Sequence, residues 1–590
     1  MPPAFQSAPI NPPVPARKAW YRRKLPTPPP PGIVLALAAF YFGFGLLGHD
    51  PWKHEDAIGV GLAWEMANGG MADWLNPHIG GISLTEEGPL YYWLAALAIK
   101  FAGLTGLTGL TGLTGGWLAA HEAARLPALV CWLATVWLLL RIGTPLFGPR
   151  QASIGALIFI GCAGLFTRAH QASAEALLVL GVTLVLAALL SNDARRTAIS
   201  MLLGGMLCMA LATGGHGYAI PLCLSAVVLV LRPAARKVML VATVVAIAGV
   251  LGWRVAAESF AVAGAPLGLA SWASAQLAVW SWPYGTRLAF IARTAVWFLF
   301  PAWPLVLAWI WRQRNQPPVF LTSNSSHDDD AAEGQRAAAR RLLFAVCLSL
   351  GVSLPFSEPG SFTVFLALLP PLALLGGFGA LALRRGAAHG FDWFAALGAS
   401  AIATYLWLYG FAAQTGVPAR AANAMLRREP GFEITFTPWL FALAVLCTLA
   451  WLWSIARIDR GTPRASRQGT TRGITRWALG ITLLWVLTMT LWLPNIENGK
   501  SFRAVSRSIG ERLPASTCAA TQAGLSERAS LRYFLGERIA HPDANPRCEY
   551  QLVSVSAADA HVPGPGWLLV WDGSRRGGRS AQFLLYRKVP

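Results

Sequence analysis

The run FTVFLALLPPLALLGGFGALAL, residues 362–383, contains no charged side chain along its whole length. An α-helix of about 20 apolar residues spans the hydrocarbon core of a bilayer. Comparable runs recur along the chain, for example at 33–47, 123–140 and 476–493. The sequence therefore predicts a polytopic α-helical membrane protein.

The composition agrees with this prediction. Of the 590 residues, 55% are hydrophobic and 13% are charged, and the mean hydropathy is +0.47. Soluble domains carry about 25% charged residues, so a soluble globular enzyme and chain-wide disorder are both excluded. The net charge of +20 comes from short basic clusters between apolar runs. That arrangement is typical of cytoplasmic loops in membrane proteins, so nucleic-acid binding is not expected.

The alternation of apolar runs and basic clusters predicts about 13 transmembrane helices, with the N-terminus inside and the C-terminus outside. The first outer loop, 48–122, is expected to hold an amphipathic surface helix at 58–66 and an interfacial helix at 90–102. Residues 313–341 are predicted to be a cytoplasmic linker. The predicted spans are 33–47, 123–140, 152–167, 174–191, 199–213, 219–232, 238–253, 290–311, 342–356, 362–383, 392–412, 438–456 and 476–493.

Three domains follow from this topology. Residues 1–31 are rich in proline and basic residues and are predicted to be a disordered cytoplasmic tail. Residues 32–494 form the membrane domain, and 495–590 are expected to be a small α/β domain on the outer side. In that last domain we predict helices and strands as follows: helices at 502–513 and 526–535, and strands at 517–521, 551–556, 567–571 and 583–587.

The cysteines give independent support for an outer C-terminal domain. Six of the eight cysteines lie in apolar runs, where they are expected to pack in the core. Only Cys518 and Cys548 lie in a polar segment. Such an isolated pair predicts one disulfide and therefore an oxidising compartment.

Polar residues gather on the predicted outer face, which is otherwise poor in acidic residues. Acidic groups at a membrane surface are costly and often mark a site, although any single one can simply be a solvated loop residue. A carboxylate there can take a proton from an acceptor hydroxyl or amine, and cations can hold a phosphate leaving group. These features suit a transferase that uses a lipid-phosphate sugar, or a transporter with acidic groups in its path. The candidate residues are Glu55, Asp56, Glu86, Glu87, Tyr92, Arg168, Glu175 and His216.

At these residues the sequence resembles the GT-C fold membrane glycosyltransferases, in particular the aminoarabinose (ArnT-like) and protein O-mannosyltransferase group. The resemblance covers roughly residues 33–385, and each motif alone is weak, whereas their order and spacing together are specific. The matching elements are Glu55-Asp56, Trp64-Glu65-Met66, the segment 86–93 ending in Pro89-Leu90-Tyr91-Tyr92-Trp93, Ala124-Arg125-Leu126-Pro127, the turn 146–150, Thr167-Arg168 with Glu175-Ala176-Leu177, and the segment 369–374.

The resemblance implies transfer of a sugar from a polyprenyl-phosphate donor to lipid A, another glycan or a protein. It implies a single displacement with inversion, a first-loop carboxylate as general base, and Glu175 at the site. The family usually has Asp followed by Glu, whereas this chain has Glu55 followed by Asp56. Which of the two is the base therefore stays open. The resemblance also implies a bacterial inner membrane protein with a periplasmic C-terminal domain and a role in the cell envelope.

Two positions depart from the family pattern. The lysine that often follows the acidic residue is Glu87 here, and a later Ser-Lys element reads Ser357-Glu358. Either arginines elsewhere, such as Arg168, replace these cations, or a divalent metal lies between Glu86, Glu87 and the phosphate. A role for His216 or His78 as a further metal ligand is a weaker hypothesis than the two glutamates.

Two other functions compete with this interpretation. An oligosaccharide ligase would use a diphosphate carrier, but the large Arg- and His-rich outer loop of that class is not evident. A transporter or flippase of lipid-linked sugars commonly shows paired internal repeats. We find no repeat between the two halves of the chain, and the candidate acidic residues lie in outer loops.

Overall fold

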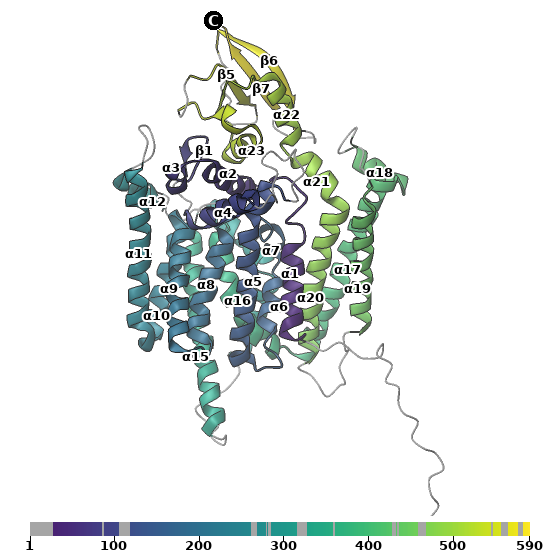
Figure 1. Cartoon of the computed structure of the whole chain (residues 1–590). Coiled ribbons are helices and arrows are strands. Elements are labelled where there is room, and N and C mark those ends of the chain that lie inside the picture. Colours follow the sequence, from purple (N-terminus) through teal and green to yellow (C-terminus); the bar gives the residue numbers. More distant parts are fainter. Residues whose placement is uncertain are drawn as a thin grey trace, which may run out of the picture.

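Long apolar helices stand side by side and form most of the molecule, and a smaller sheet-containing domain lies at one end of them (Figure 1). We call this end of the bundle the domain end. The computed structural model describes residues 28–52, 54–84, 88–104, 118–260, 268–278, 280, 285–314, 327–357, 360–427, 432, 436–457, 468–543, 547–555, 564–575 and 582–589.

The bundle is built from the apolar runs of the sequence. By length and composition, eight of the described helices could cross a membrane, or nine if one bent pair counts as a single span. Shorter apolar helices coincide with further predicted spans, and the number 13 stays a prediction. The bundle helices are α1 (Pro31–Gly43), α5 (Ala120–Phe147), α6 (Ile154–Ile160), α7 (Ala163–Arg168), α8 (Glu175–Leu190), α9 (Arg195–Ala212), α10 (Ala219–Leu231), α11 (Arg236–Ser259), α14 (Ala302–Gln313), α15 (His327–Ser353), α16 (Thr363–Ala382), α17 (Arg385–Thr415), α19 (Pro438–Arg457) and α20 (Gln468–Leu487).

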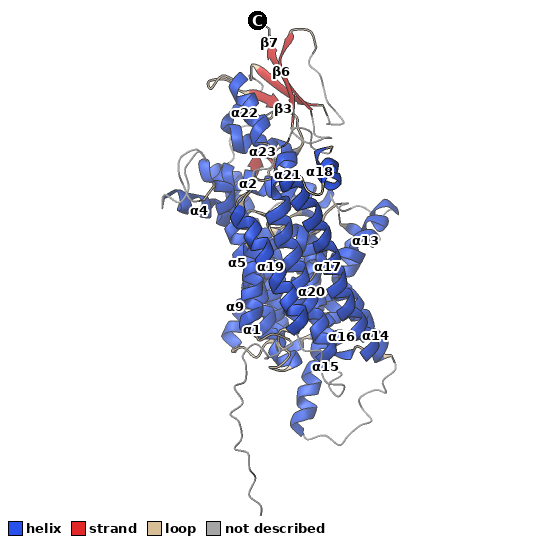
Figure 2. Cartoon of the chain, turned by 90° about the vertical axis from the view of Figure 1, so that its right-hand side faces the viewer, coloured by secondary structure: helices blue, strands red, loops and turns tan. Residues whose placement is uncertain are grey.

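Two of the predicted spans are not single straight helices. The span predicted at 290–311 bends by 90° between α13 (Gly285–Phe298) and α14, where Pro301 interrupts the helix. Figure 2 shows α13 lying out to the side of the bundle. The span predicted at 152–167 breaks between α6 and α7. At that break the Gly161 carbonyl accepts a hydrogen bond from Trp477 Nε1 (2.7 Å), and the Ala163 amide donates to the Phe300 carbonyl (2.9 Å).

Short elements of the first loop lie across the domain end of the bundle (Figure 1). They are α2 (His54–Asn68), α3 (Met71–Leu75), the antiparallel pair β1 (His78–Ile79) and β2 (Ile82–Ser83), and α4 (Leu90–Leu104). The helix predicted at 58–66 is present, but it does not lie at the surface as predicted. Helix α2 is buried on nearly every side, because α4 and α5 pack below it and the C-terminal domain covers it.

The C-terminal domain has a five-stranded sheet in the order β4-β3-β5-β7-β6, in which β3 is parallel to β4 and β5 and the other pairs are antiparallel. The predicted helices and strands are found here; the two-residue strand β4 is an addition. Cys518 and Cys548 form a disulfide beside β3 and β5. The elements are α22 (Arg503–Arg512), β3 (Ala519–Thr521), α23 (Leu525–Leu535), β4 (Ile539–Ala540), β5 (Tyr550–Ser554), β6 (Trp567–Ser574) and β7 (Gln582–Lys588).

The remaining helices connect these parts. Helix α21 (Leu493–Lys500) joins α20 to the C-terminal domain, and α15 projects from the end of the bundle opposite that domain (Figure 1). The other helices are α12 (Leu269–Ala278) and α18 (Ala419–Leu426). The bundle and α2 share one large hydrophobic core, and the C-terminal domain has its own small core around Ile509, Leu531 and Phe583.

Candidate active site

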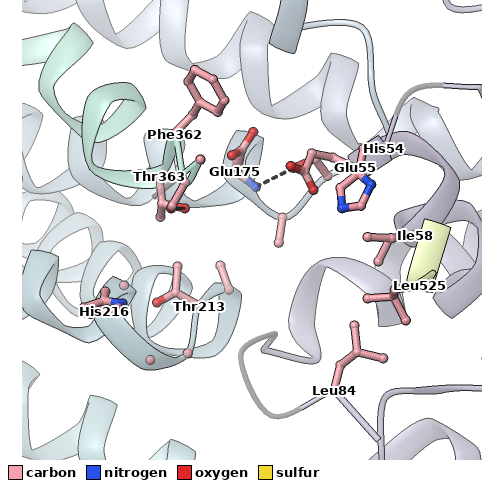
Figure 3. Close-up of a pocket in the computed structure, with 18 of the residues that line it drawn as sticks. His54, Glu55, Ile58, Leu84, Glu175, Thr213, His216, Phe362, Thr363 and Leu525 are labelled. Carbon is pink, nitrogen blue, oxygen red and sulfur yellow. Dashed lines mark hydrogen bonds between the residues drawn. The ribbon is translucent and has the colours of Figure 1, made fainter. Parts of the chain in front are cut away.

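A cavity of about 630 Å³ opens at the domain end, between the bundle and the first loop (Figure 3). Its walls come from several regions that are far apart in the sequence. They are the start of α2, the end of β2, the start of α4, the end of α7, the turns before α8 and α10, the start of α16, and the start of α23. Because apolar and charged side chains converge there, this cavity is the best candidate for a substrate site among the described residues.

Glu55 faces this cavity from the first turn of α2 (Figure 3). Its side chain is 32% exposed, and Oε1 lies 3.2 Å from Arg168 Nη1 and 3.3 Å from Nη2. Glu55 is thus a carboxyl group that is accessible from the cavity and held in a defined place by Arg168.

Glu175 lies close to Glu55 in the cavity wall (Figure 3). The two residues share one ion-pair partner, Arg168. Its Oε1 is 3.7 Å from Arg168 Nη2, and its Oε2 is buried without a hydrogen-bond partner among the described residues. The Arg168 guanidinium also lies over the Phe362 ring, 4.2 Å from its centroid. One cation is therefore placed between two carboxylates and against an aromatic face.

Asp56, the neighbour of Glu55, points away from the cavity. Its Oδ1 accepts hydrogen bonds from Arg125 Nε (3.0 Å) and the Ala172 amide (2.8 Å), and its Oδ2 accepts one from Arg125 Nη2 (2.7 Å). Both side chains of this pair are almost fully buried. Burial favours the protonated acid, but the Arg125 guanidinium outweighs it and holds the pKa of Asp56 below its usual value. Asp56 is placed to hold α2, not to contact a substrate in this cavity.

Tyr92 and His216 also line the cavity. His216 belongs to the glycine-rich turn 214–217 that precedes α10, and its ring lies 5.3 Å from that of Trp280. Position 217 has no room for a side chain, because a Cβ there would come within 2.5 Å of Thr213 Cβ. The turn therefore brings backbone groups close to the cavity, as a phosphate or sugar ligand would need.

Glu86 and Glu87 lie outside the described residues, so their predicted roles stay predictions. Within the part of the chain that the structure describes, no group of three or more His, Cys, Asp and Glu side chains could hold a metal ion. The two described carboxylates of the cavity have Arg168 between them. These residues fit a guanidinium-based site for an anion better than they fit a metal centre, and the metal stays a hypothesis that rests on Glu86 and Glu87.

Several cavity residues were not predicted from the sequence. Leu525, at the start of α23, comes from the C-terminal domain, and no local signal connects it with the first loop. Phe362 and Thr363 lie where the polar break at 357–361 meets an apolar helix. That break has the Gly and Ser composition of a loop close to a ligand, and it could have been identified on that ground.

No protein-family model and no curated protein matches the sequence. The fold, in contrast, matches solved structures over nearly its whole length. ArnT from Cupriavidus metallidurans bound to undecaprenyl phosphate has a TM-score of 0.62 at 14% identity, with 94% of this chain and 97% of that chain covered. The apo state of the same protein gives a TM-score of 0.63 at 15% identity with the same coverage.

A weaker likeness, with a TM-score of 0.41 at 12% identity, is to the archaeal oligosaccharyltransferase AglB from Archaeoglobus fulgidus in complex with an inhibitory peptide and a dolichol-phosphate. It covers 91% of this chain and 69% of that one. At these identities the similarity concerns the fold. The chain is a multi-helix membrane protein with the ArnT-like GT-C fold.

Proposed function

We propose that this protein is a glycosyltransferase that moves a sugar from a polyprenyl-phosphate donor to an acceptor at the domain end of the bundle. The observation that carries the proposal is the pair of cavity carboxylates, Glu55 and Glu175, which share the single guanidinium of Arg168. The fold of ArnT, solved with undecaprenyl phosphate, supports a lipid-linked donor.

In the proposed mechanism Glu55 is the general base. It takes the proton of the acceptor hydroxyl or amine, which attacks the anomeric carbon of the donor sugar from the opposite side to the phosphate. The anomeric carbon–oxygen bond breaks, and the electron pair leaves with the polyprenyl phosphate. The anomeric configuration is inverted by this single displacement. Asp56 is not the base in this proposal, because both of its oxygens are engaged with Arg125 and the Ala172 amide.

Arg168 has a second part in the proposal. In the structure its one positive charge is shared between two carboxyl groups, and a donor phosphate in the cavity would compete for the same guanidinium. Contact with the phosphate would stabilise the negative charge that develops on the leaving group and would release Glu55 to act as a base. Glu175, which also lines the cavity, would then orient the sugar or acceptor.

We further propose that the protein lies in a bacterial inner membrane with the cavity and residues 495–590 in the periplasm. The Cys518–Cys548 disulfide supports an oxidising compartment for that domain. The acceptor would be lipid A, another glycan or a protein.

The test of the proposed function compares the lipids and surface glycans of a strain that lacks the gene with those of its parent by mass spectrometry. We expect a polyprenyl-phosphate sugar to accumulate and the acceptor to lose the mass of that sugar. Transport of a lipid-linked sugar into vesicles without any transfer product would instead identify a flippase. Loss of transfer by the purified protein after chelation, and recovery with a divalent cation, would support the metal hypothesis at Glu86 and Glu87.

A further inference from the structure

Helix α2 carries Glu55 in its first turn and a second carboxylate, Glu65, near its other end. Glu65 follows Glu55 by ten positions, which corresponds to about 15 Å along the helix axis. Glu65 Oε1 lies 2.6 Å from Arg532 Nε, and its Oε2 lies 3.2 Å from Arg532 Nη2. The two side chains are only 7% and 12% exposed. A buried, bidentate ion pair thus joins α2, the helix that carries Glu55, to α23 of the C-terminal domain.

Each partner of this pair is fixed by further contacts. Glu65 Oε1 also accepts a hydrogen bond from the Gly80 amide (3.0 Å), and the Gly80 carbonyl accepts one from the His541 amide (3.1 Å). Arg532 Nη1 donates to the Ile539 carbonyl (2.8 Å). The pair therefore ties together α2, the β1–β2 turn and strand β4.

The C-terminal domain also holds the segment that leads into α2. The Asp50 carboxylate accepts hydrogen bonds from Ser501 Oγ (2.6 Å) and from Arg503 Nε (2.9 Å). The Asp50 carbonyl accepts one from Arg125 Nη2 (3.2 Å), and Arg125 in turn binds Asp56. The residue before Asp56 is Glu55, so this chain of contacts ends beside the proposed base.

Between these two attachments, α23 lies directly on α2. A Cβ on Gly61 would come within 2.9 Å of Ala529 Cβ, so the two helices approach closely. The first residue of α23, Leu525, lines the cavity itself. The domain that covers α2 therefore also forms part of the cavity wall.

We propose that the C-terminal domain contributes to the active site. Glu65 and Arg532 are positioning residues that hold α2 in place, and α2 in turn keeps Glu55 in contact with Arg168. The part of this proposal that concerns catalytic activity rests on the proposed glycosyltransferase function. If α2 tilts by about an ångström, the Glu55 carboxylate is misplaced, and an error of that size costs up to about a hundredfold in rate.

The test uses the full-length protein with the variants Glu65→Gln, Arg532→Gln and the double variant. Arg507→Gln is the matched control, because Arg507 is an exposed arginine of the same domain. Two readouts are taken on monodisperse protein: hydrogen exchange of the α2 amides, and turnover of a polyprenyl-phosphate sugar donor per folded molecule. Arg532→Lys, which keeps one charged donor, serves if Arg532→Gln does not fold.

We expect faster exchange in α2 and a kcat reduced about tenfold or more, with the donor KM nearly unchanged because α7 supplies Arg168. The double variant should lose no more than either single one, since the two residues act as a unit. Normal kcat per folded molecule together with unchanged α2 exchange would overturn the proposal, as would an equal effect of Arg507→Gln. If the wild-type protein transfers no sugar, the proposed function fails, while the exchange data still decide whether the pair holds α2.

Discussion

Asp56 and Arg125 form an ion pair whose side chains are 1% and 0% exposed, with Oδ2 and Nη2 2.7 Å apart. This pair turns Asp56 into the interior, whereas the adjacent Glu55 faces the cavity. Successive residues of a helix point about 100° apart, so the two neighbouring side chains can reach different surroundings. The ion pair of Asp56 with Arg125 therefore distinguishes Asp56 from Glu55, whereas the sequence left open which of the two could act as the base.

The first prediction concerns the stability of this pair. Asp56→Asn leaves the buried charge of Arg125 without its partner, which should lower the free energy of unfolding by about 3 kcal/mol. Because the pKa of Asp56 is lowered, its contribution is complete above the usual aspartate pKa of about 4 and is lost as the pH falls through its lower folded value. Melting in detergent should show a gap between wild type and variant that is constant near neutral pH and narrows under acid conditions. A gap that does not change with pH would contradict this.

The second prediction concerns Arg168. Arg168→Ala should reduce kcat/KM for the lipid donor at least about a hundredfold, because it removes the only described cation beside both cavity carboxylates. Arg168→Lys should recover only part of this loss, since an ammonium cannot contact two groups as a planar guanidinium does. Arg420→Ala, at an exposed position, is the control and should have no effect. Equal donor kinetics in Arg168→Ala and wild type would remove Arg168 from the site.

The third prediction concerns the contact that sets α2 against the turn before α8. A Cβ on Gly59 would come within 1.7 Å of the Ala172 carbonyl oxygen, so Gly59→Ala must push α2 away from that turn. We expect a lower melting temperature and a large loss of transfer. Gly398→Ala is the matched control, because Gly398 lies in α17 with no atom within 4 Å of the added Cβ. That control should be neutral or stabilising by up to about 1 kcal/mol.

The fourth prediction concerns the disulfide. The bridge between Cys518 and Cys548 closes a loop of 30 residues, which corresponds to about 3.6 kcal/mol of stability. Reduction, or the Cys518→Ser/Cys548→Ser variant, should therefore speed proteolysis within the C-terminal domain. The membrane helices should keep their resistance, because the six other cysteines are free. Protease patterns that do not change on reduction would show that the bridge contributes little.

Much of the fold could be predicted because apolar length and charge placement are local properties of the sequence. The helices α22 and α23 and the strands β3, β5, β6 and β7 were found where they were expected. The bend between α13 and α14 was not predicted, although Pro301 lies at it. Hydropathy alone does not distinguish one span from two helices at a right angle.

The site was harder to predict than the fold. Glu55, Arg168 and Glu175 are brought together in the cavity, as expected for parts of one site. The role of Asp56 depends on Arg125, which is 69 residues away in the sequence. The burial of α2 and the presence of Leu525 in the cavity wall depend on a domain more than 400 residues further along the chain. Such long-range contacts leave no periodicity or spacing in a single sequence.

The proposed role of Glu55 is tested most directly by single-turnover transfer from a polyprenyl-phosphate sugar by purified wild-type protein, Glu55→Gln and Asp56→Asn. The three proteins are compared per folded molecule, and released polyprenyl phosphate is measured by mass spectrometry. We expect Glu55→Gln to bind donor but to transfer at least about a hundredfold more slowly, whereas folded Asp56→Asn, which loosens α2 but keeps the base, should lose only about tenfold. Normal transfer by Glu55→Gln would contradict the assignment of Glu55 as the base and, with it, the proposed mechanism.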